Sequence, residues 1–168
     1  MNFYHNPVLK AESLNALQLE QGGLFVDCTL GGGGHSEAIL QSGHALELIG
    51  LDRDYEALDH ANKRLDGYDN FRSIHTPFGL ISDYFKEGKL SGILMDLGIS
   101  SRQIDNGARG FSYRNSDYVD LRMDQSQGTS AVDWLLETPA DEIVKVFKRN
   151  ADMRSTYKFI MRLKEFSQ

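Results

Sequence analysis

Asp27-Cys28-Thr29-Leu30-Gly31-Gly32-Gly33-Gly34-His35-Ser36 is the most informative stretch of this 168-residue chain. It follows the apolar run Leu24-Phe25-Val26 and precedes a helix-like segment, Glu37-Ala38-Ile39-Leu40. The four adjacent glycines remove every Cβ atom from the turn, so the backbone can adopt positive φ angles and approach a ligand closely. Amides exposed at the start of the following helix favour polar or anionic groups. This order of strand, glycine loop and helix predicts a binding site for a nucleotide-like cofactor.

Strand and helix patterns alternate along the N-terminal part of the chain. Apolar runs predict strands at residues 24–29, 46–51, 71–75 and 90–97, and helical patterns occupy residues 13–19, 36–42 and 55–65. Strands and helices that alternate through short links are typical of a doubly wound parallel sheet, so we expect an α/β fold. Residues 98–128 have no clean period, and only helices are expected after them, including one over 154–166.

The composition is that of an ordinary globular protein, with 40% hydrophobic and 25% charged residues. No apolar run approaches the roughly 18 residues that span a membrane, and the N-terminal residues lack the features of a signal peptide. The single cysteine, Cys28, excludes an internal disulfide and a cysteine-based zinc cluster. The histidines show no metal-ligand spacing. We therefore expect a cytoplasmic protein that binds neither a membrane nor a metal ion.

The charge is unevenly distributed. The net charge of −6 argues against broad, nonspecific binding to nucleic acid. Residues 1–144 hold 11 Lys and Arg against 22 Asp and Glu, whereas residues 145–168 hold 7 against 2. A basic segment on an acidic body could touch phosphate, and a solvated amphipathic helix explains the same pattern, so both interpretations stay open.

Asp52 ends the second predicted strand, about 20 residues beyond the glycine loop, where a carboxylate can accept hydrogen bonds from ribose hydroxyls. Two features favour S-adenosylmethionine (SAM) over NAD as the ligand. Ser36 stands where the dinucleotide fingerprint has its third glycine. The negative charge of Asp27 would repel a diphosphate, which SAM lacks. An NAD-binding oxidoreductase stays open as a more remote alternative.

Asp96 ends the fourth predicted strand, which should lie beside the first. Ligands bind at the carboxyl ends of parallel strands, so we expect Asp96 to face the cofactor, although it could instead cap the next turn. We expect His35 to orient the glycine loop rather than to transfer protons.

A loop rich in arginine and aromatic residues follows, at residues 109–114 and 120–124. Arginines and aromatic rings suit an unpaired base, because rings stack on it and guanidinium groups hold phosphate. The competing interpretation is a loop that packs on itself through internal Arg–Asp pairs.

Several segments together carry a family resemblance. The chain resembles the bacterial small-subunit ribosomal RNA cytosine-N4 methyltransferases, which use SAM to modify one cytidine. The matching segments are residues 5–9, 27–36, 51–54, 75–78, 96–105, 109–113 and 120–124. The resemblance implies a class I SAM-methyltransferase fold, which is a Rossmann-like parallel sheet with an inserted helical domain. It also implies ribosomal RNA or the small ribosomal subunit as the partner.

The resemblance assigns roles to individual residues. Gly33, Gly34 and His35 would line the methionine part of SAM. Asp52 would hold the ribose, and Phe78 would pack against the adenine. Asp96 and Gln103 would complete the cofactor site. Since the cytosine N4 attacks the sulfonium methyl group, the protein mainly aligns the reactants and stabilises the amino group as it loses a proton. Asp96 is the candidate catalytic base by its position.

The resemblance also implies a domain organisation. Residues 1–108 would form the SAM-binding core, and residues 109–168 part of the inserted helical domain. The family has a proline where Arg102 stands. Its members are nearly twice as long, so we expect an incomplete sheet whose fourth strand is an open edge. An open edge favours self-association, here as a homodimer. A non-catalytic SAM- or RNA-binding remnant is the main alternative to an active enzyme.

Overall fold

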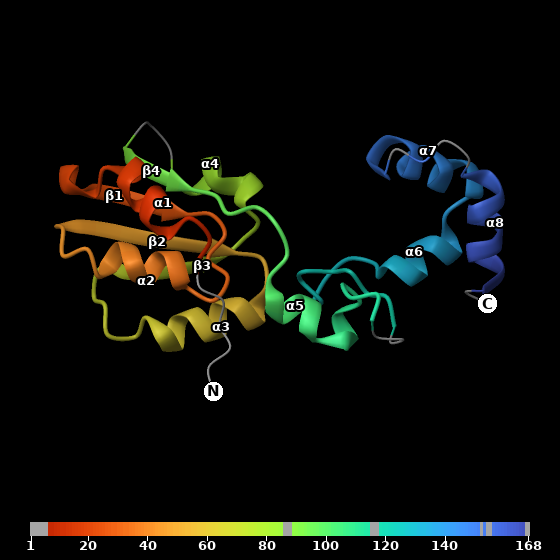
Figure 1. The fold of residues 1–168 in the computed structure, drawn as a ribbon, viewed down its shortest axis with the longest axis horizontal. Coiled ribbons are helices and arrows are strands. Elements are labelled where there is room, and N and C mark those ends of the chain that lie inside the picture. The colour runs from red at the N-terminus through yellow and green to blue at the C-terminus, as the bar shows by residue number, and fades with distance from the viewer. Residues whose placement is uncertain (1–6, 86–88, 115–117, 152, 154–155, 167–168) are drawn as a thin grey trace. The chain divides into compact units, whose positions relative to one another are not determined.

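The computed structural model describes residues 7–85, 89–114, 118–151, 153 and 156–166 (Figure 1). The chain forms two compact units, residues 1–102 and residues 103–168. The functional division at residues 108 and 109 stays a prediction.

The first unit is built on a parallel sheet. Its strands are β1 (Gly23–Asp27), β2 (Leu46–Asp52), β3 (Phe71–His75) and β4 (Leu90–Leu94). They lie in the order β3-β2-β1-β4, and each neighbouring pair is parallel. This order is that of the first four strands of the Rossmann arrangement, so the predicted α/β fold class is confirmed.

Three helices of this unit lie within three residues of the predicted positions, and α4 (Ile81–Tyr84) was not predicted. The helices are α1 (Lys10–Leu17), α2 (Gly34–Leu40), α3 (Tyr55–Arg64) and α4, with short 3-10 turns η1 (Leu19–Gln21) and η2 (Phe78–Leu80). Asp54 starts α3, because its side chain accepts a hydrogen bond of 3.0 Å from the Glu56 amide. None of the helices that the structure describes is long and apolar enough to cross a membrane.

Alternate strand residues face opposite sides of the sheet and form two apolar clusters. Phe25 and Leu48 belong to the larger cluster, which includes residues of α2 and α3 and packs against Leu14 and Leu17 of α1. Val26 and Ile49 belong to the smaller cluster on the other face, where partly buried residues such as Ile81 of α4 pack. Figure 1 shows α2 and α3 along one side of the sheet and α4 beside β4. Cover on both faces is what a parallel sheet requires.

The fourth strand is shorter than predicted. We expected it to continue to Leu97, but β4 ends at Leu94. The partner strand β1 ends at Asp27, where the chain enters the glycine loop, so residues beyond Leu94 soon lose a strand to pair with. The apolar residues after Leu94 therefore resemble a strand in sequence without forming one.

The second unit is helical. Its elements are α5 (Ser101–Asp105, which begins in the first unit), η3 (Gly107–Arg109), α6 (Ala131–Glu137), α7 (Ala140–Ala151) and α8 (Tyr157–Phe166). Helices α7 and α8 contact each other, Ile143 and Ile160 are fully buried, and the ring centroids of Phe147 and Phe159 lie 6.1 Å apart. The predicted helix over residues 154–166 is present from Tyr157 on, and residues 154 and 155 lie outside the described residues.

Candidate cofactor site

The glycine loop is tied to the end of β2 by Asp52. The Gly31 amide donates a hydrogen bond of 2.8 Å to Asp52 Oδ2, and the Asp54 amide donates one of 2.9 Å to Asp52 Oδ1. Burial raises the pKa of the Asp52 carboxyl above its ordinary value, while these amide bonds lower it in part. A carboxylate has about four acceptor positions, so Asp52 can still accept a hydroxyl group beside its backbone bonds.

Two glycines let the loop approach its neighbours closely. Gly33 has φ +76°, in the left-handed region, and a Cβ atom there would lie 3.3 Å from both Ala61 Cβ and Leu65 Cδ1. A Cβ atom on Gly34 would lie 2.8 Å from Pro7 Cγ. A side chain at either position would therefore press against packed atoms of the first unit. The loop keeps its course because these residues have none.

Asp27 lies beneath the loop and is only 1% exposed. Its Oδ1 accepts a hydrogen bond of 3.1 Å from the Thr29 amide, and its Oδ2 accepts one of 2.8 Å from Ser36 Oγ. Burial raises the pKa of this carboxyl, and the bonds from Ser36 and Thr29 offset part of the rise. Burial also raises the pKa of the neighbouring Cys28 thiol to about 11, so this cysteine stays protonated near neutral pH. Through its bonds to Thr29 and Ser36, Asp27 organises the loop from inside.

Asp96 and His35 meet beside the loop. The Asp96 amide donates a hydrogen bond of 2.8 Å to Thr29 Oγ1, while the Asp96 side chain is 54% exposed. The Nε2 atom of His35, in the first turn of α2, lies 3.7 Å from Asp96 Oδ2. The His35 ring is buried, and its Nδ1 has no hydrogen-bond partner among the described residues. This side of the loop presents an exposed carboxylate next to a buried imidazole.

Aromatic side chains follow the carboxyl ends of β2 and β3. Phe78 begins η2 and is 43% exposed. The Thr76 amide donates to the Asp52 carbonyl oxygen at 2.9 Å, which places this segment beside the end of β2. The rings of Tyr55 and His75 stack, with centroids 3.6 Å apart. The sequence predicted Phe78 but not this stacked pair, which could have been found only from the register of β2 and β3.

Known proteins are similar to this chain over nearly its whole length. The model of the MraW methylase family matches residues 2–166. The ribosomal RNA small subunit methyltransferase H of Francisella tularensis subsp. novicida is 39% identical, over 98% of this chain and 55% of its own length. The protein of the same name from Clostridium botulinum is 38% identical, over 94% of this chain and 52% of its own length. The chain belongs to the MraW methylase family. It spans about half the length of these curated relatives.

Membership of the MraW methylase family confirms the resemblance found in the sequence. Among solved structures, an rRNA methylase from Streptococcus thermophilus aligns with a TM-score of 0.46 at 21% identity, over 56% of each chain. Six of the seven predicted cofactor residues of this family member lie in the first unit, at the loop, at the end of β2 or after the ends of β3 and β4: Gly33, Gly34, His35, Asp52, Phe78 and Asp96.

The seventh residue, Gln103, belongs to the second unit, where its side chain is buried. Its place in the cofactor site stays a prediction. No group of three or more His, Cys, Asp or Glu side chains in the described ranges is arranged to hold a metal ion.

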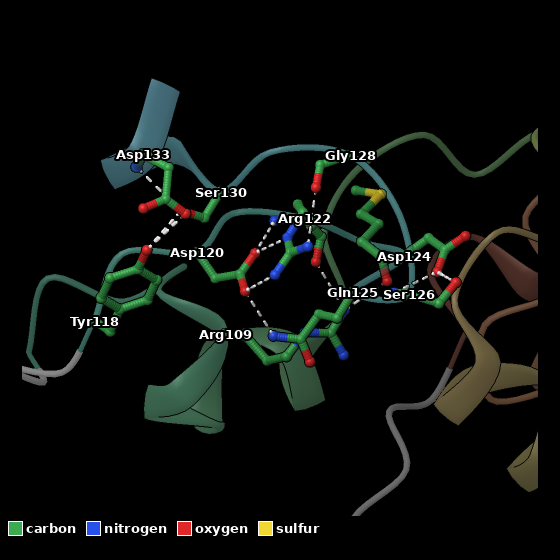
Figure 2. Close-up of polar contacts among 11 residues, drawn as sticks. Arg109, Tyr118, Asp120, Arg122, Asp124, Gln125, Ser126, Gly128, Ser130 and Asp133 are labelled. Atoms are coloured by element: carbon green, nitrogen blue, oxygen red, sulfur yellow. Dashed lines mark hydrogen bonds and ion pairs between the residues drawn. The ribbon is translucent and has the colours of Figure 1, made fainter. Parts of the chain in front are cut away.

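The arginine-rich loop of this MraW family member packs on itself (Figure 2). Arg122 donates from Nε and Nη2 to the two oxygens of Asp120, at 2.7 and 2.8 Å. This guanidinium group holds the pKa of Asp120 well below its usual range. Arg109 is buried and donates from Nη2 to the carbonyl oxygens of Arg122 and Met123, at 3.2 and 2.7 Å. Of the two interpretations of this loop, internal Arg–Asp pairing is therefore confirmed.

Proposed function

We propose that the glycine loop, Asp52 and Asp96 bind SAM, and that the chain serves in methylating the N4 atom of a cytidine in small-subunit ribosomal RNA. The observation that carries the proposal is the hydrogen bond from the Gly31 amide to Asp52, which fixes the loop at the carboxyl edge of the sheet. Ligands of open parallel sheets bind at this edge. The family relation favours SAM over NAD.

Each predicted cofactor residue of the first unit has its own role in this proposal. Asp52 would accept a hydrogen bond from the ribose, and the half-exposed Phe78 ring would cover the adenine. The backbone of Gly33 and Gly34 would contact the methionine part, with His35 beside it. Gln103 stays a proposed cofactor residue on the ground of the family resemblance alone.

The reaction asks for little covalent chemistry from the protein. SAM supplies a methyl group activated by its sulfonium sulfur. The cytosine N4 lone pair would form the new N–C bond while the C–S bond broke and its electrons stayed on sulfur. The N4 atom then has a proton to lose, and Asp96 is the exposed carboxylate at this edge that would accept it. The negative charge of Asp96 would also favour the positive sulfonium before transfer.

The proposed partner is ribosomal RNA or the small ribosomal subunit, which implies a cytoplasmic location. In this proposal residues 1–108 hold the cofactor and residues 109–168 form part of the substrate side. Because Arg109 and Arg122 are engaged inside the 109–124 loop, contacts to RNA would come from other groups of residues 109–168, such as the exposed Arg114.

We further propose that copies of the chain form a homodimer through β4. This strand lies at an edge of the sheet that the described residues form. Ile93, Met95 and Leu97 are about half exposed or more along it and just beyond it. Unpaired edges with apolar side chains favour pairing with another strand.

Two measurements test the enzymatic proposal. Isothermal titration calorimetry with SAM and with NAD identifies the ligand, and we expect binding of SAM alone. Transfer of a labelled methyl group from SAM to small subunits or to their purified RNA then tests activity. Binding of SAM without transfer would support the non-catalytic alternative. Binding of NAD without SAM would contradict the proposal.

A further inference from the structure

We propose, on the basis of the function proposed above, that Thr29 is the positioning residue of the site. Its hydroxyl group holds the backbone of Asp96 and connects it to the buried Asp27. Thr29 touches neither partner of the proposed reaction in this role. It sets where the Asp96 carboxylate stands.

The Thr29 hydroxyl group takes the place of a backbone hydrogen-bond acceptor in the sheet. The last backbone hydrogen bond between the segments that continue β1 and β4 runs from the Cys28 amide to the Leu94 carbonyl oxygen, at 2.9 Å. In a regular parallel ladder the next amide on the β4 side would donate to a backbone carbonyl. The Asp96 amide instead donates to Thr29 Oγ1, at 2.8 Å. The side chain thus carries the pairing of the two segments beyond the point where their strands end.

Thr29 is itself held by hydrogen bonds to the buried Asp27. Its amide donates to Asp27 Oδ1 at 3.1 Å, and its hydroxyl donates to the same oxygen at 3.4 Å. The second oxygen of Asp27 accepts from Ser36 Oγ at 2.8 Å. Asp27 and Ser36 are 1% and 0% exposed, so this base of the network is enclosed by packed atoms. A β-branched threonine also has few χ1 rotamers, which limits its own movement.

The Thr29 hydroxyl group links the exposed Asp96 to the buried Asp27. One hydroxyl group can donate one hydrogen bond and accept another, and Thr29 uses it both ways, toward Asp27 and from Asp96. Asp96 is 54% exposed and contacts the His35 ring at 3.7 Å only through its side chain. Without the hydroxyl group its amide would turn to water, and the carboxylate would sample other positions.

The test is a double-mutant cycle on SAM affinity. Thr29→Val removes the hydroxyl group and keeps the shape, Thr29→Ser keeps the hydroxyl group, and Asp96→Ala removes the carboxylate. One hydrogen bond of this kind corresponds to a change of about three- to tenfold in affinity. We expect Thr29→Val to weaken SAM binding by this factor, Thr29→Ser to match the wild type, and Thr29→Val to have no further effect in the Asp96→Ala background.

The cycle separates positioning from a general structural role. A residue that only supports the fold would weaken binding equally with and without the Asp96 carboxylate. Equal losses in the two backgrounds, or a Thr29→Ser variant as weak as Thr29→Val, would overturn the proposal. Thermal unfolding of each variant shows whether the fold is kept.

A second measurement does not depend on SAM. Amide hydrogen exchange followed by NMR should show a protected Asp96 amide in the wild type and in Thr29→Ser, and an unprotected one in Thr29→Val. A wild type that binds no SAM would contradict the proposed function but would leave this test in force. An Asp96 amide that exchanges equally fast in all three proteins would overturn the role of Thr29.

Discussion

Gly33 offers a quantitative test of how the loop is packed. Gly33→Ala places a Cβ atom on a residue with φ +76° and 3.3 Å from both Ala61 Cβ and Leu65 Cδ1. The left-handed conformation costs an alanine about 1 kcal/mol more than a glycine. Ala61 and Leu65 are almost wholly buried and cannot move away freely. We add about 1 kcal/mol for this crowding, at the low end for an overpacked core.

Gly43 provides the matched control. It has the same φ of +76°, but a Cβ atom there would meet nothing within 4 Å. Gly43→Ala therefore carries the conformational cost alone, about 1 kcal/mol, whereas Gly33→Ala should lose about 2 kcal/mol. Urea denaturation with linear extrapolation measures both free energies of unfolding. Equal losses in the two variants would refute the packing of the loop against α3.

Three further predictions concern the acid beneath the loop, a strained residue and the sheet edge. Because the native pKa of Asp27 lies above 3.8, its contribution to stability is present below pH 3.8 and is lost as the pH rises through the native pKa. The free energy of unfolding of Asp27→Asn should therefore rise relative to that of the wild type as the pH rises. Urea titrations at several pH values measure this difference, and a difference that does not change with pH would contradict the prediction. Leu121 is 45% exposed and has φ +61°, so Leu121→Val should destabilise the chain by about 1 kcal/mol in thermal unfolding while Leu121→Asn should not; equal effects would count against strain at this position. Multi-angle light scattering should give the mass of a dimer for the wild type and of a monomer for Ile93→Lys, and a monomeric wild type at high concentration would exclude association through β4.

The sequence predicted the position of the cofactor site because the ends of strands can be found from the pattern of apolar residues. The alternation of apolar runs and helical segments located the ends of β1 and β2 within two residues. In a parallel sheet those ends share one edge, so Asp52 and the glycine loop had to be neighbours. Their direct hydrogen bond confirms this. The whole network rests on Asp27, whose position before the glycines is visible in the sequence.

Other features depend on contacts that no pattern contains. The residues after Leu94 are as apolar as a strand, but β1 ends at Asp27 and offers them no strand to pair with. An arginine in a loop can face water or the interior, and only the structure shows Arg109 buried and Arg122 paired with Asp120. Thr29 carries no signal in the sequence, because its importance lies in an acceptor atom directed at the Asp96 amide.

Calorimetric titration of SAM into three proteins tests the central claim most directly: the wild type, Asp52→Ala and Asp59→Ala. Asp52 is the acid that ties the loop to β2. Asp59 is an exposed acid on α3 that pairs with Lys63, so its loss changes the net charge equally without touching the loop. We predict that the wild type and Asp59→Ala bind SAM alike and that Asp52→Ala does not bind it measurably. Undiminished binding by Asp52→Ala, or no binding by the wild type, would contradict the account.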